Sequence, residues 1–394
     1  MKIGVLTIHA ACNFGANLQA YTSSNYLTTL GHDVKVINYI REREKQYKKN
    51  IPAQQHEAHH RFVTTKLALT STITNEEELI ELVKQERFDL IIVGADAVWR
   101  SEKNNLFFLN SIVNNKELTF CKVASMSAAH MGIGFTNMEI QEREKIANAL
   151  QRYSFISVRD VWTAKMINRD IFNGENFVKN INPDPVFLLD TILPKDEHWN
   201  CLVTESKKYY LMTLPKNWAE GKKSKKRIAW FNGFKKLVNN CGYKLIELPL
   251  PEGKSGMSFD YTVDYPIDSL QWFLWIKNAK AFCGLRFHAI VSSISCGTAF
   301  YSIDSYGSSS ILSRILTKLN LYGIARRLDK QSKIRNLLQG SGYEKNRITR
   351  DIEQASPQVV FNRLNSFDTE KILEFRNRNI SIFKENMQKI ISSI

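Results

Sequence analysis

The sequence lacks long uninterrupted apolar runs. No stretch of about 18 uncharged apolar residues occurs in it, so we expect no membrane-spanning helix. The N-terminal stretch MKIGVLTIHA has no basic region, long apolar core or small-residue cleavage site, and we expect no signal peptide. The six cysteines are scattered without a CxxC pair, which indicates reduced thiols and predicts a cytoplasmic protein.

Several signatures of common chemistries are also missing. The chain has no GxxxxGK[ST] phosphate loop, no GxGxxG before a helix and no GxSxG nucleophile elbow. Residues 56–60 (HEAHH) formally match the zinc signature H-E-x-x-H. Their flanks are polar and basic, Pro52 lies just upstream and no third ligand is evident, so we expect no metal and no cofactor.

The net charge of +15 is the one unusual bulk property, and it suggests a polyanionic partner. The basic residues gather at Lys207–Lys208, Lys222–Arg227 and Lys235–Lys236, and again at Arg326, Arg327, Lys330, Lys333 and Arg335. No RNP-like motif, zinc-finger spacing or basic tail accompanies them, which argues against nucleic acid. Some of these basic residues form an ordinary solvated surface. The others suit peripheral contact with anionic lipid at the inner face of a membrane.

Strands and helices alternate along the first half of the chain. Residues 2–8 and 34–39 read as strands around a helix at roughly 16–30, and this βαβ opening predicts a parallel sheet. Further strands are expected at 88–94, 119–127 and 154–158, with capped helices beginning near Asn75 and Thr136. Residues 41–60 are charged without clear apolar periodicity, so we expect a mobile loop there.

The same alternation restarts after a polar connection around 190–206. Strands are expected at 208–214 and 244–248, and helices at 267–278 and roughly 308–320. The last 60 or so residues are charged and helical in pattern. We therefore predict an α/β protein with an N-terminal domain at 1–190, a C-terminal domain at 191–330 and a helical tail at 331–394.

Residues 279–304 (AKAFCGLRFHAIVSSISCGTAFYSID) are the most informative stretch. They read as a buried strand, a tight turn at Gly284, a small-residue helix and a second strand. Arg286 and His288 are two residues apart, so on an extended segment they would project from the same side. A fixed cation beside a titratable imidazole at a helix N-terminus suits an anionic substrate that needs a proton. A surface ion pair and a histidine bonded to backbone are the structural alternative.

Another candidate segment follows the first strand, in NFGANLQAY at 13–21. Asn13, Asn17 and Gln19 supply uncharged donors and acceptors of the kind that sugar recognition uses. A turn at Gly15 before a helix is equally a good helix cap, so a purely structural role stays open.

Three further segments follow predicted strands. Asp96 in VGADAVW would lie at the carboxyl end of a strand, where α/β sheets bind ligands; capping the next turn is its structural alternative. Trp99 suits either the core or a wall on which a sugar stacks. Arg159 in SVRD is placed to clamp a carboxylate or phosphate, while Asp160 suits a helix N-cap. Asp184, between two prolines in NPDPVFLL, favours a structural role.

Taken together, these segments resemble the polysaccharide pyruvyl transferase family. The likeness runs through KIGVLT, NFGANLQAY, VGADAVW, SVRD and DPVFLL, and continues through SLQWFLWIKNAKAF and GLRFHAIVSSISCGTAFYSI to SSSILSRILTKLNL, over roughly residues 1–320. Two features depart from the family: Ala129-His130-Met131-Gly132 replaces an Ala-Ser-Phe-Gly-like run, and Arg-x-His accompanies an N-terminal motif whose relatives often carry Asp-Ser-Phe-His. His130 is therefore a further candidate site residue.

The resemblance implies a GT-B-like architecture, with two Rossmann-like domains facing a cleft. It implies a transferase of polysaccharide (exopolysaccharide or capsule) biosynthesis that moves the enolpyruvyl-derived group of phosphoenolpyruvate, its co-substrate, onto two sugar hydroxyls as a ketal. Arg286 and Arg159 would bind the donor, with His288 and Asp96 as catalytic groups. Asn13, Asn17, Gln19 and Trp99 would contact the acceptor, a lipid-linked or nucleotide-linked saccharide. On this reading the N-terminal domain is the acceptor side and the C-terminal domain the donor side.

Two other functions fit the same sequence. A nucleotide-sugar glycosyltransferase on the same two-domain plan would bind UDP- or GDP-sugars instead of phosphoenolpyruvate. A basic binding protein without chemistry would dock on nucleic acid or anionic lipid, with a steep salt dependence that Arg286 and His288 do not influence.

Overall fold

The computed structural model of the chain contains two compact units. It describes residues 1–42, 44, 51–130, 134–194, 207–221, 224–303, 332–348 and 355–394. The first unit comprises Met1–Lys49, His59–Ile192 and Arg378–Ile394, and the second comprises Asn50–Ala58 and Leu193–Asn377. Compared with the predicted division, residues 50–58 thus join the second unit and residues 378–394 the first. The predicted helix at 308–320 and the basic residues at 326–330 lie outside the described residues.

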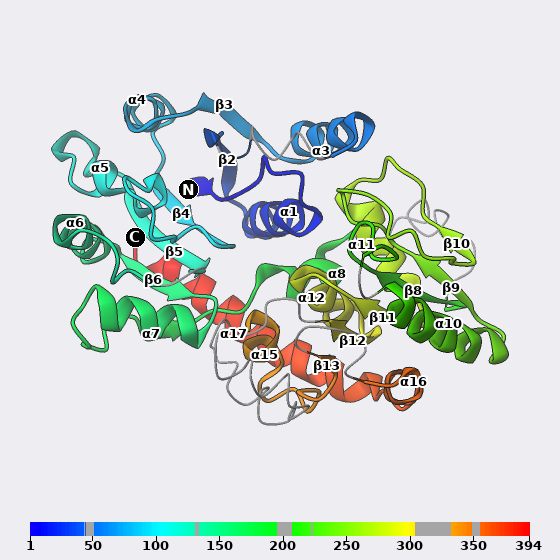
Figure 1. The fold of residues 1–394 in the computed structure, drawn as a ribbon. Coiled ribbons are helices and arrows are strands. Elements are labelled where there is room, and N and C mark those ends of the chain that lie inside the picture. Colours follow the sequence, from blue (N-terminus) through cyan, green and yellow to red (C-terminus); the bar gives the residue numbers. More distant parts are fainter. Residues whose placement is uncertain are drawn as a thin grey trace. The chain divides into compact units, whose positions relative to one another are not determined.

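The first unit is built on a seven-stranded parallel sheet in the order β3-β2-β1-β4-β5-β6-β7 (Figure 1). The strands are β1 (Lys2–Leu6), β2 (Asp33–Tyr39), β3 (Leu69–Ile73), β4 (Leu90–Val93), β5 (Lys122–Ala128), β6 (Phe155–Val158) and β7 (Asn180–Ile181). Every residue of β4 is buried, as expected for a strand covered on both faces, and such strands read as continuous apolar runs.

Helices cover this sheet, and several begin where the sequence places a capping residue. They are α1 (Phe14–Thr29), α3 (Ala53–Lys66), α4 (Glu76–Glu86), α5 (Asn110–Val113), α6 (Ile140–Leu150), α7 (Val161–Asp170) and α8 (Leu189–Ile192). Asn75 accepts from the Glu78 amide and Asp160 from the Thr163 amide, which confirms both predicted caps. The predicted cap at Thr136 is wrong, because α6 begins after Glu139, whose side chain makes no capping bond.

The expected loop at 41–60 is also wrong from residue 53 onward, because α3 is a regular helix. Its buried positions are Gln55, Ala58, His59, Phe62 and Val63, which repeat at the three- and four-residue spacing of one helix face. A glutamine and a histidine occupy two of these buried positions, which are usually apolar. The apolar periodicity of a helix is therefore weak in this segment, and the sequence did not predict the helix.

The second unit contains a six-stranded parallel sheet in the order β10-β9-β8-β11-β12-β13. Its strands are β8 (Tyr209–Thr213), β9 (Lys244–Glu247), β10 (Tyr261–Thr262), β11 (Ala281–Gly284), β12 (Ala299–Ile303) and β13 (Arg347–Ile348). Its helices include α10 (Ser224–Asn240), α11 (Ser269–Asn278), α12 (Phe287–Cys296), α15 (Lys333–Leu338) and α16 (Pro357–Asn365). No helix in the described ranges is long and apolar enough to cross a bilayer.

Among the described residues of the predicted tail most are helical, residues 339–346 form turns and bends, and β13 adds a strand to the second sheet. The first part of the long helix α17 (Thr369–Ser392) belongs to the second unit, and the part from Arg378 onward belongs to the first. In its first part the Arg376 guanidinium donates to the carbonyl of Ser295, and further on the Asn386 amide donates to the carbonyl of Ile181. The tail is therefore an integral part of both units.

We predict that Gly284→Ala destabilises the chain by about 3 kcal/mol or more, since strained backbone and steric overlap both contribute. Gly284 has a φ of 156°, and a Cβ there would lie 2.4 Å from the Thr213 carbonyl oxygen. The matched control is Gly242→Ala, at a φ of 78° with open space around the added carbon, for which about 1 kcal/mol is expected. Chemical denaturation checks this, and equal losses in the two variants would contradict it.

Candidate functional site

Each sheet has a strand at which the order of strand addition reverses. In the first unit the chain adds β2 and β3 on one side of β1 and then returns to place β4 on the other side. In the second unit β9 and β10 lie on one side of β8, and β11 on the other. Ligands of open parallel sheets bind outside the carboxyl ends of the strands at such a reversal. The segments that follow β4 and β11 therefore hold the first candidates.

A glycine precedes the candidate residue in both segments. Gly94 follows β4 with a φ of 128°, and a Cβ there would lie 1.9 Å from the Met126 carbonyl oxygen. Gly284 ends β11 in the same kind of contact. Two residues later, Asp96 and Arg286 both have positive φ, at 71° and 85°. Neither glycine position has room for a Cβ, and the turn that follows puts each candidate at the carboxyl edge of its sheet.

In the first unit Arg159 joins a buried polar network. Its Nη1 lies 3.2 Å from Oδ2 of Asp184 and 3.9 Å from Oδ1 of Asp96, and its side chain is only 4% exposed. Gln19 Nε2 donates to the same Asp184 oxygen at 2.5 Å, while Asp184 Oδ1 accepts from the Val186 amide. Asp184 thus has the structural role that the sequence favoured. Through this network Gln19 and Arg159 share one oxygen of Asp184, and Asp96 lies beside Arg159.

The other amides of the NFGANLQAY segment are used inside the first unit. Asn13 caps α1, because its Oδ1 accepts from the amides of Gly15 and Ala16. Asn17 is fully buried: its Nδ2 donates to the His9 carbonyl at 2.6 Å, and its Oδ1 accepts from His59 Nδ1 at 2.7 Å. These contacts favour the structural alternative for both residues, and their predicted contact with an acceptor stays a prediction.

Trp99 does not fit the acceptor-binding role predicted for it. Its side chain has no exposed surface, it stacks on Phe108, and its Nε1 donates to the carbonyl of Phe107. The strand preceding it is buried on both faces, so a large apolar side chain that follows enters the core. Trp99 is a core residue.

His130 is likewise buried, and internal hydrogen bonds use both of its ring nitrogens. Nδ1 donates to the Trp99 carbonyl at 2.7 Å, and Nε2 accepts from the Gly134 amide at 3.1 Å. This pattern requires the neutral imidazole, and burial lowers the pKa of His130 accordingly. The geometry favours a structural role, and a part in the site stays a prediction. Two other residues of the departing run, at 131 and 132, lie outside the described residues.

In the second unit Arg286 and His288 are arranged differently from the prediction. Arg286 is the N-cap of α12 and His288 belongs to the first turn of that helix. The expectation that both lie on one side of an extended segment is therefore wrong, because the helix begins one residue after the arginine. Both residues are partly exposed, and the Arg286 side chain makes no capping bond. The first-turn amides of α12 thus face the carboxyl edge beside a guanidinium, an arrangement that favours anions.

Sequence reasoning missed the carboxylate that contacts Arg286. Glu252 lies in the loop after β9, and its Oε1 accepts from Arg286 Nη2 at 2.7 Å. Tyr265, in the loop after β10, is close enough for the charges of Glu252 and Arg286 to influence its pKa. Both loops follow strands of one parallel sheet. Their position at its carboxyl edge is the one feature of the sequence that could have identified these two residues as candidates. Neither residue belongs to a recognisable motif.

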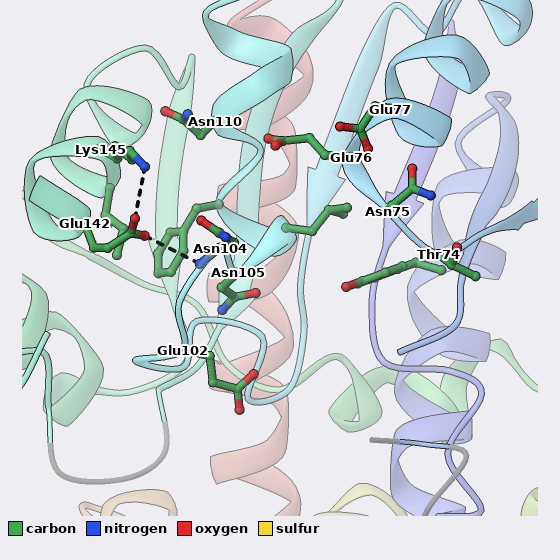
Figure 2. A pocket seen from close by; sticks show the side chains of 14 residues that line it. Thr74, Asn75, Glu76, Glu77, Glu102, Asn104, Asn105, Asn110, Glu142 and Lys145 are labelled. Atoms are coloured by element: carbon green, nitrogen blue, oxygen red, sulfur yellow. Dashed lines mark hydrogen bonds and ion pairs between the residues drawn. The ribbon is translucent and has the colours of Figure 1, made fainter. Parts of the chain in front are cut away.

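A cavity of about 400 Å³ in the first unit has the wrong charge for an anion (Figure 2). Glu76, Glu77, Glu102 and Glu142 surround it, and Lys145 bonds to Glu142 at 3.0 Å. Glu76 and Glu77 occupy the first turn of α4, where acidic residues stabilise the helix dipole. The residues 56–60 are helical, yet no group of three or more metal-ligating side chains exists within the described part of the chain.

Comparison with known proteins relates the chain to one family. The family model described as "Polysaccharide pyruvyl transferase" matches residues 13–306. Among curated proteins, none matches the sequence.

Solved structures with a similar fold have little sequence identity to this chain. UDP-GlcNAc 2-epimerase from Methanocaldococcus jannaschii is 12% identical, with 95% of this chain and 98% of that chain covered and a TM-score of 0.50. UDP-N-acetylglucosamine 2-epimerase from Rickettsia bellii is 11% identical, with coverages of 100% and 96% and a TM-score of 0.49. E. coli heptosyltransferase WaaC with ADP is 10% identical, with coverages of 93% and 100% and a TM-score of 0.38. At such identities the likeness concerns the fold alone, which is GT-B-like with two Rossmann-like sheets, as predicted.

We predict that Asp184→Asn lowers the free energy of unfolding by about 3 kcal/mol, because it leaves the buried Arg159 guanidinium without its closest counter-charge. The control in the same unit is Glu117→Gln, which removes an ion pair to Lys84 whose glutamate is 70% exposed, and its stability should stay close to that of the wild type. Urea unfolding followed by circular dichroism compares the two. A loss at Asp184 no larger than the control would show that the network does not stabilise the fold.

Proposed function

Because the chain belongs to the polysaccharide pyruvyl transferase family, we propose that it transfers the enolpyruvyl-derived group of phosphoenolpyruvate onto two hydroxyls of a saccharide, forming a pyruvate ketal. The observation that carries the proposal is the position of Arg286 and His288. Both lie at the N-terminus of α12, directly after β11 at the reversal point of the second sheet. A cation, helix amides and an imidazole in one place match an anionic donor that must gain a proton.

The binding of a carboxylate at Arg286 is supported by the contact that this side chain already makes. Glu252 places a carboxylate oxygen 2.7 Å from Nη2, with both side chains more than a third exposed. An exposed ion pair of this kind contributes only about 0–1 kcal/mol, so an incoming anion can replace it. The Arg159 pair is nearly buried, and replacing it would cost several kcal/mol. Donor binding therefore suits Arg286 better than Arg159, whose predicted donor contact would require the guanidinium to release Asp184.

In the proposed reaction His288 acts as general acid and protonates the methylene carbon of phosphoenolpyruvate, which gives the central carbon oxocarbenium character. One sugar hydroxyl attacks this carbon and loses its proton, and the C–O bond to phosphate breaks. The second hydroxyl then adds to the same carbon with loss of a second proton and closes the ketal. The products are the ketal and inorganic phosphate. We assign to Asp96 the orientation or deprotonation of the acceptor, since its side chain keeps some exposure beside Arg159.

The proposed acceptor is a lipid-linked or nucleotide-linked saccharide, and the proposed location is the cytoplasm. The outer side of α10 supports peripheral contact with an anionic membrane, because Lys225, Lys226 and Lys236 are exposed there. No metal and no further cofactor enters the proposed reaction.

His288→Ala should lower the rate of phosphate release from phosphoenolpyruvate by about 10²–10⁴-fold, the usual cost of losing a positioned acid. The control His60→Ala removes an exposed histidine of α3 and should release phosphate at the wild-type rate. Both variants are assayed with a glycan panel, and their folding is checked by circular dichroism. Near-normal phosphate release by the folded His288 variant would remove this residue from the acid role.

Arg286→Lys should also lose most activity, because an ammonium group cannot replace a bidentate guanidinium. The same preparations can be tested for a melting shift with UDP- and GDP-sugars. A shift with a nucleotide sugar and none with phosphoenolpyruvate would favour the glycosyltransferase alternative over pyruvyl transfer.

A further inference from the structure

Three loops of the second unit meet the carboxyl edge of one parallel sheet. Glu252 follows β9, Tyr265 follows β10 and Arg286 follows β11. The strands β9 and β10 lie on one side of β8, and β11 lies on the other (Figure 1). These residues therefore surround the reversal point at which such sheets bind ligands.

Only one of the two carboxylate oxygens of Glu252 has a hydrogen-bond partner among the described residues. Oε1 accepts from Arg286 Nη2, a contact that a bound anion would replace. The second oxygen, Oε2, is buried and has no hydrogen-bond donor among the described residues. A buried acceptor that receives no hydrogen bond destabilises a fold, so native proteins seldom leave such an atom without a partner.

The hydroxyl of Tyr265 is in the same situation. It is buried, the Gly253 amide is the one donor near it, and its own O–H donates no hydrogen bond within the described part of the chain. Burial raises the pKa of Tyr265, and the charges of Glu252 and Glu247 raise it further against the opposing effect of Arg286. The phenol is therefore protonated at neutral pH and can donate one hydrogen bond as well as accept one.

We propose that Glu252 and Tyr265 form a hydroxyl-binding pair that holds the acceptor saccharide beside Arg286. A sugar hydroxyl can donate to Oε2 of Glu252 and accept from the Tyr265 O–H, so that the unused acceptor and the unused donor both gain a partner. A phosphate or carboxylate cannot donate to Glu252 and would be repelled by its charge. The charges of these residues thus distinguish the two substrates. The anionic donor binds Arg286, and the neutral hydroxyl of the acceptor binds Glu252 and Tyr265. This inference rests on the proposed function.

Kinetics of the full-length chain test the pair through Tyr265→Phe. Methyl glycosides of galactose, glucose, mannose and N-acetylglucosamine, together with lipid-linked glycans, serve as acceptors in a phosphate-release assay. With the best acceptor, we expect the variant to raise the acceptor KM about 10-fold, the equivalent of one lost hydrogen bond. The KM for phosphoenolpyruvate and its Kd by calorimetry should stay within twofold. Tyr261→Phe, an exposed tyrosine of β10, is the control and should change neither constant.

Glu252→Gln provides the second variant, because it keeps the shape of the side chain and removes the charge. The acceptor KM should again rise about 10-fold or more, while phosphoenolpyruvate binds at least as tightly as to the wild type, since a nearby negative charge is gone. A weaker Kd for phosphoenolpyruvate with an unchanged acceptor KM would mean that Glu252 only holds Arg286 in place. That result would overturn the hydroxyl-binding pair.

The outcomes also separate this inference from the function on which it rests. If the wild-type protein fails to release phosphate with every acceptor of the panel, the proposed function is overturned, and the pair with it. If the wild-type protein is active but Tyr265→Phe has the same acceptor KM as the control Tyr261→Phe, only the hydroxyl-binding pair is overturned. A loss of thermal stability in Tyr265→Phe without any change in acceptor KM would show that the hydroxyl has a structural role only.

Discussion

A glycine held against the backbone of a neighbouring strand determines where the candidate groups lie in each unit. A Cβ at Gly94 or Gly284 would approach a carbonyl oxygen of that strand to 1.9 or 2.4 Å, so no other residue fits without a shift of the backbone. Each glycine ends or follows the strand next to the reversal point of its sheet. The chain therefore turns within two residues and leaves Asp96 and Arg286 at positive φ on the carboxyl edge. Backbone packing, rather than side-chain contacts, sets the position of these residues.

The two charged clusters built on these turns differ in how strongly they are held. Arg159 and Asp184 form a nearly buried pair with further hydrogen bonds, and breaking it would leave an uncompensated charge inside the first unit. Arg286 and Glu252 are more than a third exposed, so water screens their attraction. The first cluster therefore behaves as part of the fold. The second can exchange its partner for an anion, and for this reason the proposed chemistry is assigned to it.

Local sequence patterns predicted the strands, the caps at Asn75 and Asp160 and the parallel α/β plan, because apolar runs and capping side chains act over a few residues. Long-range packing decided the rest. The helix α3 was missed because a glutamine and a histidine occupy its buried face, and their partners are distant in sequence. Trp99 entered the core instead of a binding wall. Glu252 and Tyr265 have no motif, and only the order of the strands brings their loops to the edge that carries Arg286. Secondary structure was thus largely predictable, and the composition of the site was not.

The central claim is that the second unit presents phosphoenolpyruvate to sugar hydroxyls. Mass spectrometry of glycans incubated with the purified protein and phosphoenolpyruvate tests it most directly. The account predicts a product heavier than the glycan by one pyruvate less one water, formed together with one equivalent of inorganic phosphate. Glycans of unchanged mass across lipid-linked and free acceptors, with phosphoenolpyruvate left intact, would contradict it.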